Sequence, residues 1–235
     1  MEHERERLYT MDRPRRLDLE RVRDDNMALL DIGRFLVISR SHINARTLDR
    51  MVRRGHVICS RHIVGRGWKR IDVVTLTDRG QQEAERIALQ VREPFSRSQT
   101  SHLEHDVAVY GAYRDFAACV HRAGGRVTGV VLERDLRSGL VKSVGKSKDM
   151  LGDLWRFAQA HDLHIRSGAV QLPDVRVLYQ DANGQEKSKD LEVVTESYSA
   201  ASVGAKTSAG FAIYDTNSMH RARDERSHMA DLLGH

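Results

Sequence analysis

The sequence predicts an α/β (α+β) protein of two domains, and three observations support this. Its 235 residues are enough for two small domains, each with its own hydrophobic core. Helical periodicity alternates along the chain with short strand-like runs, which is typical of α/β and α+β folds. Residues 93–101 break this patterning with Pro94 and several serines, which predicts a linker between the two domains.

The composition excludes several classes of protein. Hydrophobic residues make up 40 % of the chain and charged residues 30 %, and no apolar run is long enough to span a bilayer. The first residues are charged, so neither a signal peptide nor a membrane anchor is expected. Only two cysteines, Cys59 and Cys119, argue against a disulfide scaffold and for a reducing compartment. The expected location is therefore cytoplasmic.

The first domain is predicted to be helical in its first half. Residues 1–20 lack apolar periodicity and are expected to form a flexible or partly helical arm, and the domain proper covers 21–92. Apolar residues from Leu19 to Leu36 fill one face of a helix. A short helix is predicted at Ser41–Asn44 and a third helix at Ala45–Arg54, which Gly55 would end.

A hairpin and a closing helix follow the third helix. Two strand-like runs, His56–Val64 and Ile71–Leu76, flank a basic tip, and Thr77 or Asp78 would cap a helix from Arg79 to Val91. This order is that of a winged helix-turn-helix, and the segment VVTLTDRGQQEAE resembles the last wing strand and following helix of many bacterial winged-helix regulators. In that architecture the third helix enters the major groove of DNA and the wing contacts the backbone.

The positive charge is concentrated in this domain. Between Ser39 and Arg70 the sequence has nine basic residues and one acid, Asp49, a pattern typical of a polyanion-binding surface. The alternative is an ordinary solvated helix face. The third-helix arginines are expected to point outward, and the candidate DNA contacts are Arg40, Arg46, Arg50, Arg53, Arg54, Arg66, Lys69 and Arg70.

The second domain, residues 102–235, is predicted to mix strands and helices. Gly139–Lys148 is expected to be a basic loop able to touch a DNA backbone. An Asn183-Gly184 turn joins two strands into a hairpin. The expected elements are a helix at His102–His121, a strand at Val127–Leu132, a helix at Asp149–Ala160, strands at Val175–Tyr179 and Lys189–Thr195, a helix at Tyr198–Ser208, a strand at Phe211–Tyr214 and a helix at Met219–Leu233.

Two carboxylates of this hairpin form a candidate catalytic site. Asp174 precedes one strand and Glu192 lies on its partner, so both can converge at one end of the sheet and bind Mg²⁺ or Mn²⁺. Pro173-Asp174 with Glu192 resembles the signature of the PD-(D/E)xK nucleases. Val194 stands where that signature has lysine, and Lys206 follows one helix later, a displacement known in that superfamily. The alternatives are a turn-capping aspartate, an exposed strand carboxylate and a surface lysine.

The order of motifs resembles the plasmid replication-relaxation family. The matching stretches are HLEHDVAVYGAYRDFA, VLERDLRSG, LPDVRVLY and DLEVVTESYSAASVGAK, which cover most of residues 102–206. Members of the family look like a winged helix followed by a PD-(D/E)xK nuclease-like mixed sheet flanked by helices. The resemblance implies that Glu133, Asp174, Glu192 and Lys206 surround one cleft. From the residues alone, Glu133 could equally be a helix-start acid.

The sequence therefore supports two possible functions. The first is a DNA-binding protein of a plasmid, phage or other mobile element, whose winged helix docks on double-stranded DNA while a nuclease-like domain cleaves or nicks it with Mg²⁺ or Mn²⁺. The second is a non-catalytic transcriptional or replication regulator with a degenerate nuclease-like domain and no cofactor. A homodimer and a protein partner in a replication or conjugation machine are open possibilities, and no membrane is expected.

Overall fold

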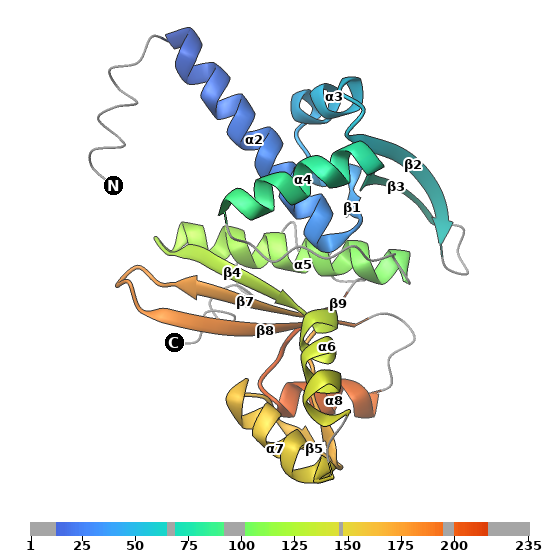
Figure 1. Cartoon of the computed structure of the whole chain (residues 1–235), viewed down its shortest axis with the longest axis vertical. Coiled ribbons are helices and arrows are strands. Elements are labelled where there is room, and N and C mark those ends of the chain that lie inside the picture. Colours follow the sequence, from blue (N-terminus) through green and yellow to red (C-terminus); the bar gives the residue numbers. More distant parts are fainter. Residues whose placement is uncertain (1–12, 65–68, 92–101, 146–147, 195–199, 216–235) are drawn as a thin grey trace. The chain divides into compact units, whose positions relative to one another are not determined.

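The computed structural model divides the chain into two compact units, Met1–Val107 and Ala108–His235. It describes residues 13–64, 69–91, 102–145, 148–194 and 200–215, and each unit combines helices with a β-sheet, as predicted (Figure 1). The division falls inside helix α5 (Leu103–Arg122), shortly after the predicted linker at 93–101, all of which lies outside the described residues. No helix in these ranges is both long and apolar enough to cross a membrane.

The first unit packs three helices against a small antiparallel sheet. The sheet has the order β1-β3-β2, and strands β2 and β3 form a long hairpin in which Val57 pairs with Leu76. The order of elements is the predicted one, with one short additional strand at the start of the sheet. The elements are α2 (Arg13–Phe35), β1 (Ile38–Ser39), the 3₁₀ helix η1 (Arg40–His42), α3 (Ala45–Arg53), β2 (Val57–Val64), β3 (Lys69–Leu76) and α4 (Asp78–Val91).

Side-chain caps and one close packing contact fix the ends of these helices. The Asn44 side chain accepts a hydrogen bond from the Arg46 N–H and starts α3, and the Thr77 hydroxyl accepts one from the Gly80 N–H and starts α4. Gly80 packs so closely on the His56 carbonyl that a Cβ atom would lie 1.9 Å from its oxygen. Helix α4 is thereby held against the start of the hairpin.

Two elements of this unit differ from the expectation in their bounds. Helix α2 begins at Arg13, so residues 13–20 of the expected arm are helical, and residues 1–12 lie outside the described part of the chain. The expected short helix is a single 3₁₀ turn and covers Arg40–His42 instead of Ser41–Asn44. The reason is that Asn44 caps α3 and therefore has extended backbone geometry.

The second unit is built on a mixed four-stranded sheet in the order β4-β7-β8-β9. The first three strands are antiparallel neighbours, whereas β9 lies parallel to β8 and is reached through helix α8. The predicted Asn-Gly turn joins β7 to β8 and has Gly184 at φ 78°. The elements after α5 are β4 (Arg126–Leu132), α6 (Glu133–Val144), α7 (Met150–Ala160), β5 (Ile165–Arg166), β6 (Ala169–Val170), β7 (Val175–Gln180), β8 (Glu186–Val194), α8 (Ala200–Ser208) and β9 (Ala212–Asp215).

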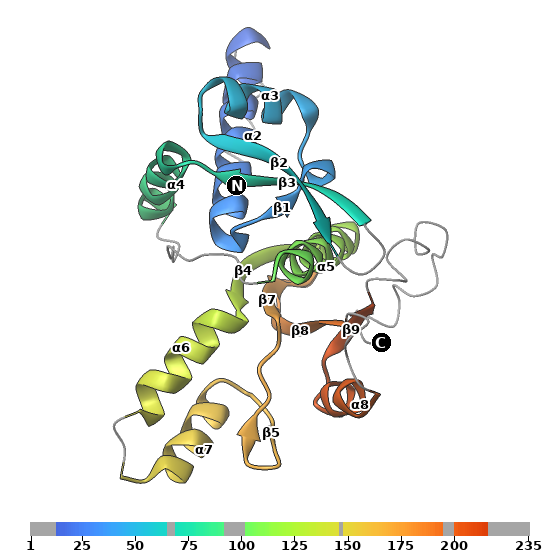
Figure 2. The same ribbon diagram turned by 90° about the vertical axis from the view of Figure 1, so that its right-hand side faces the viewer.

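Apolar side chains on one face bury the middle of this sheet. Val175, Val177 and Leu191 are completely buried, and the Phe116 ring of α5 meets the Tyr179 ring of β7 edge-on at 5.5 Å. In both Figure 1 and Figure 2, helices α6 and α7 and the small β5–β6 hairpin lie together beyond one end of the sheet.

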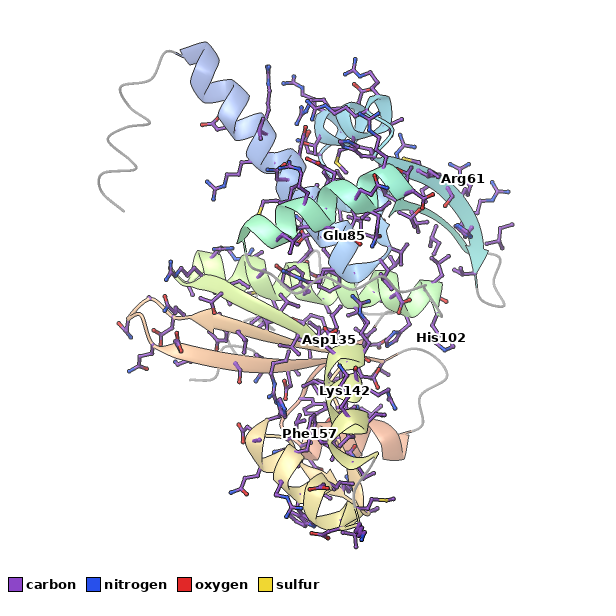
Figure 3. All side chains as sticks on the ribbon, in the orientation of Figure 1. Arg61, Glu85, His102, Asp135, Lys142 and Phe157 are labelled. Atoms are coloured by element: carbon purple, nitrogen blue, oxygen red, sulfur yellow. The ribbon has the colours of Figure 1, made fainter. Side chains whose placement is uncertain are left out.

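The predicted basic loop at Gly139–Lys148 is largely helix α6 instead. Leu136 packs with Phe157 of α7 in a small core, and a Cβ atom at Gly139 would lie 3.2 Å from the Phe157 ring. Gly139 is therefore a packing residue and not a helix breaker. Lys142 accordingly lies on the exposed side of α6 (Figure 3). The expected C-terminal helix at Met219–Leu233 lies outside the described residues.

Candidate functional site

The register of the central hairpin brings the two predicted carboxylates together. Val175 pairs with Leu191, so Asp174, one residue before β7, stands opposite Glu192 on β8. Both residues are buried, with exposed fractions of 8 % for Asp174 and 1 % for Glu192. The Val193 N–H donates a hydrogen bond of 2.7 Å to Asp174 Oδ2, which places that oxygen beside the backbone that carries Glu192.

Lys206 reaches Glu192 from helix α8. Its Nζ lies 3.0 Å from both carboxylate oxygens of Glu192 and donates a 2.6 Å hydrogen bond to the Leu172 carbonyl. The same nitrogen lies 5.2 Å from the centre of the Phe211 ring. A carboxylate as deeply buried as Glu192 is costly unless a cation is paired with it. Lys206 of α8 therefore supplies the cation that stabilises the buried carboxylate of Glu192.

Glu133 joins the same region through its backbone and its side chain. It is the first residue of α6, and its N–H donates a 3.0 Å hydrogen bond to the Asp174 carbonyl. Its carboxylate forms an ion pair with Arg137, one turn along the helix. The four residues that the resemblance grouped around one cleft are thus linked in the structure by hydrogen bonds, by an ion pair and by strand register.

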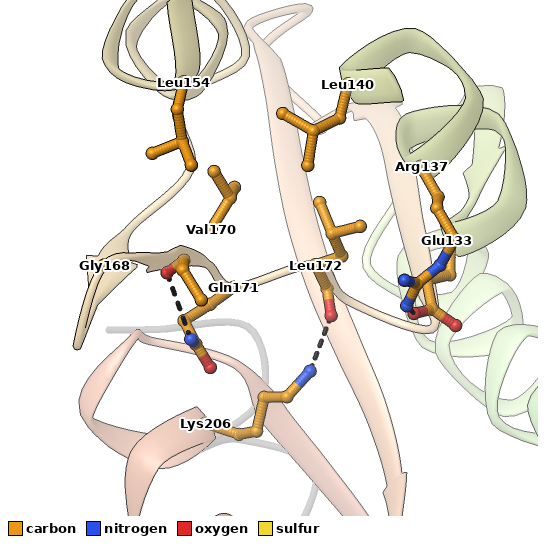
Figure 4. A pocket seen from close by; sticks show the side chains of 10 residues that line it. Glu133, Arg137, Leu140, Leu154, Gly168, Val170, Gln171, Leu172 and Lys206 are labelled. Carbon is orange, nitrogen blue, oxygen red and sulfur yellow. Dashed lines mark hydrogen bonds and ion pairs between the residues drawn. The ribbon is translucent and has the colours of Figure 1, made fainter. Parts of the chain in front are cut away.

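A cavity of about 370 Å³ opens beside Lys206, and its walls come from α6, α7, α8 and the β5–β6 hairpin. Apolar side chains gather on one side, while Lys206, Gln171 and the Glu133–Arg137 pair form the other (Figure 4). The lining residues are Glu133, Arg137, Leu140, Leu154, Gly168, Ala169, Val170, Gln171, Leu172 and Lys206. The cavity thus combines an apolar wall with two cations.

The donor set at the hairpin fits a hard divalent cation. Mg²⁺ is usually held by one or two carboxylates together with water and substrate oxygens. Asp174 and Glu192 supply two carboxylates at opposed positions of the hairpin. Within the described ranges, no group of three or more His, Cys, Asp or Glu side chains could hold a metal on its own. A cation bound here would therefore complete its coordination with water or phosphate oxygens.

The eight candidate DNA contacts of the first unit fall into three groups. Arg40, Arg46 and Arg70 are exposed, and Arg53 is exposed while paired with Asp49 on the same helix. Arg66 and the side chain of Lys69 lie outside the described residues. The sequence pattern counted Arg61 among the basic residues but did not single it out as a DNA contact. Arg61 is exposed on β2 (Figure 3), and it pairs with Asp72 of β3 at 2.6 Å. Its position on the predicted wing was the signal that could have identified it.

The remaining two arginines, Arg50 and Arg54, are held by an acid of helix α2. Arg50 Nη2 lies 2.6 Å from Asp25 Oδ1, and Arg54 Nη1 lies 2.9 Å from Asp25 Oδ2. Asp25 is only 3 % exposed, and its hydrogen bond raises the pKa of Arg50. The expectation that Arg50 points outward was wrong, because a buried acid that is distant in sequence turns its side chain inward. Arg54 is half exposed and shares the same acid.

Comparison of this chain with protein-family models, with curated proteins and with solved structures finds no match. The candidate site is therefore supported by the sequence motifs and by the contacts in this structure, and not by a known relative.

Proposed function

We propose that this chain is a DNA-binding protein whose first unit docks on duplex DNA and whose second unit cleaves or nicks DNA with Mg²⁺ or Mn²⁺. The observation that carries the proposal is the position of Lys206. Its ammonium group meets Glu192 directly opposite Asp174, which supplies the carboxylate and lysine groups of a PD-(D/E)xK-like site even though Val194 occupies the usual lysine position.

In this proposal each group has a definite task. Asp174 and Glu192 would hold a divalent cation, which would supply the Lewis acid that polarises a phosphodiester and activates water. Lys206 places a positive charge beside Glu192, where it can stabilise developing negative charge on the phosphate or orient the attacking water. Glu133 holds Arg137 at the rim of the adjoining cavity, where the guanidinium can receive a neighbouring phosphate.

The first unit supplies the DNA-docking surface in this proposal. Its order of helices followed by an antiparallel hairpin and a closing helix supports a winged helix-turn-helix. The exposed side chains of Arg40 and Arg46 near the start of α3, and of Arg61 and Arg70 on the hairpin, are available to phosphates. Binding through such contacts releases counterions, so affinity should fall steeply as salt increases.

The proposed biological setting comes from the resemblance to the replication-relaxation family. The quoted motifs fall on α5, the β4–α6 junction, the start of β7, and β8 with α8. These are the elements that carry or support the four candidate catalytic residues. A plasmid, a phage or another mobile element is therefore the setting proposed for this protein.

A plasmid cleavage assay tests the catalytic part of the proposal. The whole chain is incubated with supercoiled plasmid, with and without Mg²⁺ or Mn²⁺, and is expected to give relaxed or linear product only with metal. Glu192→Gln keeps the shape of the side chain and should abolish cleavage. Glu186→Gln, at the exposed start of the same strand, is the matched control and should cut like the wild type.

The second candidate is the non-catalytic regulator, and one observation favours it. Glu192 is paired with Lys206 and Asp174 accepts the Val193 N–H, so both carboxylates already serve the fold. Salt-dependent DNA binding without cleavage in either metal would support this candidate and contradict the nuclease. A flat salt response in an anisotropy titration would remove the DNA-binding proposal altogether.

A further inference from the structure

The cavity beside Lys206 has two unlike walls. Leu140, Leu154, Val170 and Leu172 form an apolar wall contributed by α6, α7, β6 and the segment leading into β7. On the opposite side, Figure 4 shows Lys206 and Gln171 directed towards the same space. A flat, mostly apolar ring with a polar edge and a charged neighbour matches such a site, whereas a bare phosphate would leave the apolar wall uncovered.

From this arrangement we infer that the cavity receives an unpaired nucleobase. The substrate of the proposed nuclease would then be DNA with a base out of its stack, at a single-stranded or bubbled site. This inference rests on the proposed function and extends it to the substrate class. The apolar wall covers the face of the base, and the cations Arg137 and Lys206 hold the flanking phosphate beside the carboxylates.

Size and polarity both support this occupant. The volume of about 370 Å³ is at the small end of ligand pockets. A paired base shows only its edges in the grooves, so it can enter such a cavity only after leaving the helix. The Gln171 side chain donates to the Ala169 carbonyl, and its amide offers the hydrogen-bonding groups that read the edge of a base.

The chemistry of the lining gives the inference a direct spectroscopic test. None of the residues that line the cavity is aromatic, so a base inside it has no ring to stack on. 2-Aminopurine, whose fluorescence is quenched by stacking in DNA, should therefore brighten when it enters. The probe is placed in a single-stranded oligonucleotide, in an unpaired position of a duplex and in a fully paired duplex, without divalent metal so that no cleavage occurs.

Two substitutions of the same kind test whether the brightening depends on the cavity or on another part of the surface. Ala169→Phe fills the cavity from strand β6, whereas Ala160→Phe adds the same ring at an exposed position at the end of α7. The unpaired probes should brighten with the wild type and with Ala160→Phe. With Ala169→Phe, the concentration needed for brightening should rise about tenfold, which corresponds to about 1.4 kcal/mol.

Three other outcomes would overturn the inference, each in a distinguishable way. Brightening with the free 2-aminopurine nucleotide but not with the oligonucleotides would assign the cavity to a small-molecule nucleotide. DNA binding by anisotropy without any brightening would remove the base pocket and leave the proposed function standing. Absence of DNA binding at any salt concentration would remove both.

Discussion

In each unit of this protein a buried acid pairs with basic side chains from another element, and the two clusters have opposite consequences. In the first unit, Asp25 of α2 holds Arg50 and Arg54, which draws positive charge away from the proposed DNA-binding surface. In the second, Glu192 of β8 holds Lys206, which brings positive charge into the proposed catalytic site. A buried ion pair can thus remove a cation from a functional surface or deliver one to it, depending on where the acid lies.

The largest effect is expected from removing the lysine of the second cluster. Lys206→Met leaves the Glu192 carboxylate, only 1 % exposed, without its cation, which should lower the free energy of unfolding by about 4 kcal/mol. Urea unfolding of the whole chain measures this. Lys187→Met is the control, because its pair with Asp181 is on the surface and should contribute far less to stability than the buried pair.

A double substitution shows whether the second cluster is a paired unit. Glu192→Gln combined with Lys206→Met removes both charges, so most of the lost stability should return. If the double variant were as unstable as the sum of the single variants, the two groups would not be coupled.

A smaller loss is expected in the first cluster. Asp25→Ala leaves two arginines unpaired, but their side chains are 21 % and 51 % exposed and can reach water. The free energy of unfolding should fall by about 2 kcal/mol, less than for Lys206→Met. Asp24→Ala, at the neighbouring exposed position, should change stability by less than about 0.5 kcal/mol. A loss at Asp25 as large as that at Lys206 would contradict this contrast.

The two clusters also predict which arginines contact DNA. Arg46→Ala removes an exposed cation at the start of α3 and should reduce the slope of log affinity against log salt by about one. Arg23→Ala, exposed on α2, is the control and should leave the slope unchanged. An unchanged slope for Arg46→Ala would exclude this residue from the interface.

The smallest effect concerns a pair that is exposed rather than buried. The hydrogen bond from Arg61 lowers the pKa of Asp72 below its ordinary value of 3.8. A lowered pKa in the folded state adds stability above pH 3.8, and this is lost as the pH falls through the folded value. Asp72→Asn should therefore slightly flatten the acid side of the stability profile, measured by thermal unfolding. An unchanged profile would show that this exposed pair adds nothing.

Local patterns predicted much of the fold. Gly55, at φ 69°, follows helix α3 as expected, and the Asn-Gly turn sets the register that puts Asp174 opposite Glu192. Local patterns failed where a distant partner decides the outcome. Gly139 is helical because Phe157 packs on it, and Arg50 turns inward because Asp25, one helix earlier, is buried. Such tertiary contacts leave no periodic signal in the sequence.

The residues of the candidate site could be predicted from the sequence, but the contacts between them could not. Glu133, Asp174, Glu192 and Lys206 were each picked out, yet the residue types alone could not distinguish Lys206 from a surface lysine. Its direction depends on helix α8 crossing back to the sheet, which is a property of the topology. The cavity lined by α7 and the β5–β6 hairpin could not be predicted from the sequence either, because the strands of that hairpin have only two residues each.

The parallel pairing of β9 with β8 has a consequence for how the protein is made. A parallel neighbour needs a crossover connection, and here that connection is α8, which carries Lys206. During synthesis Glu192 leaves the ribosome before Lys206. Burying the centre of β8 is therefore unfavourable until α8 has docked, because the Glu192 carboxylate has no cation until then. The growing chain therefore completes its charged centre only after the sheet-building hairpin is in place, and a chain that ends before α8 would lack this centre.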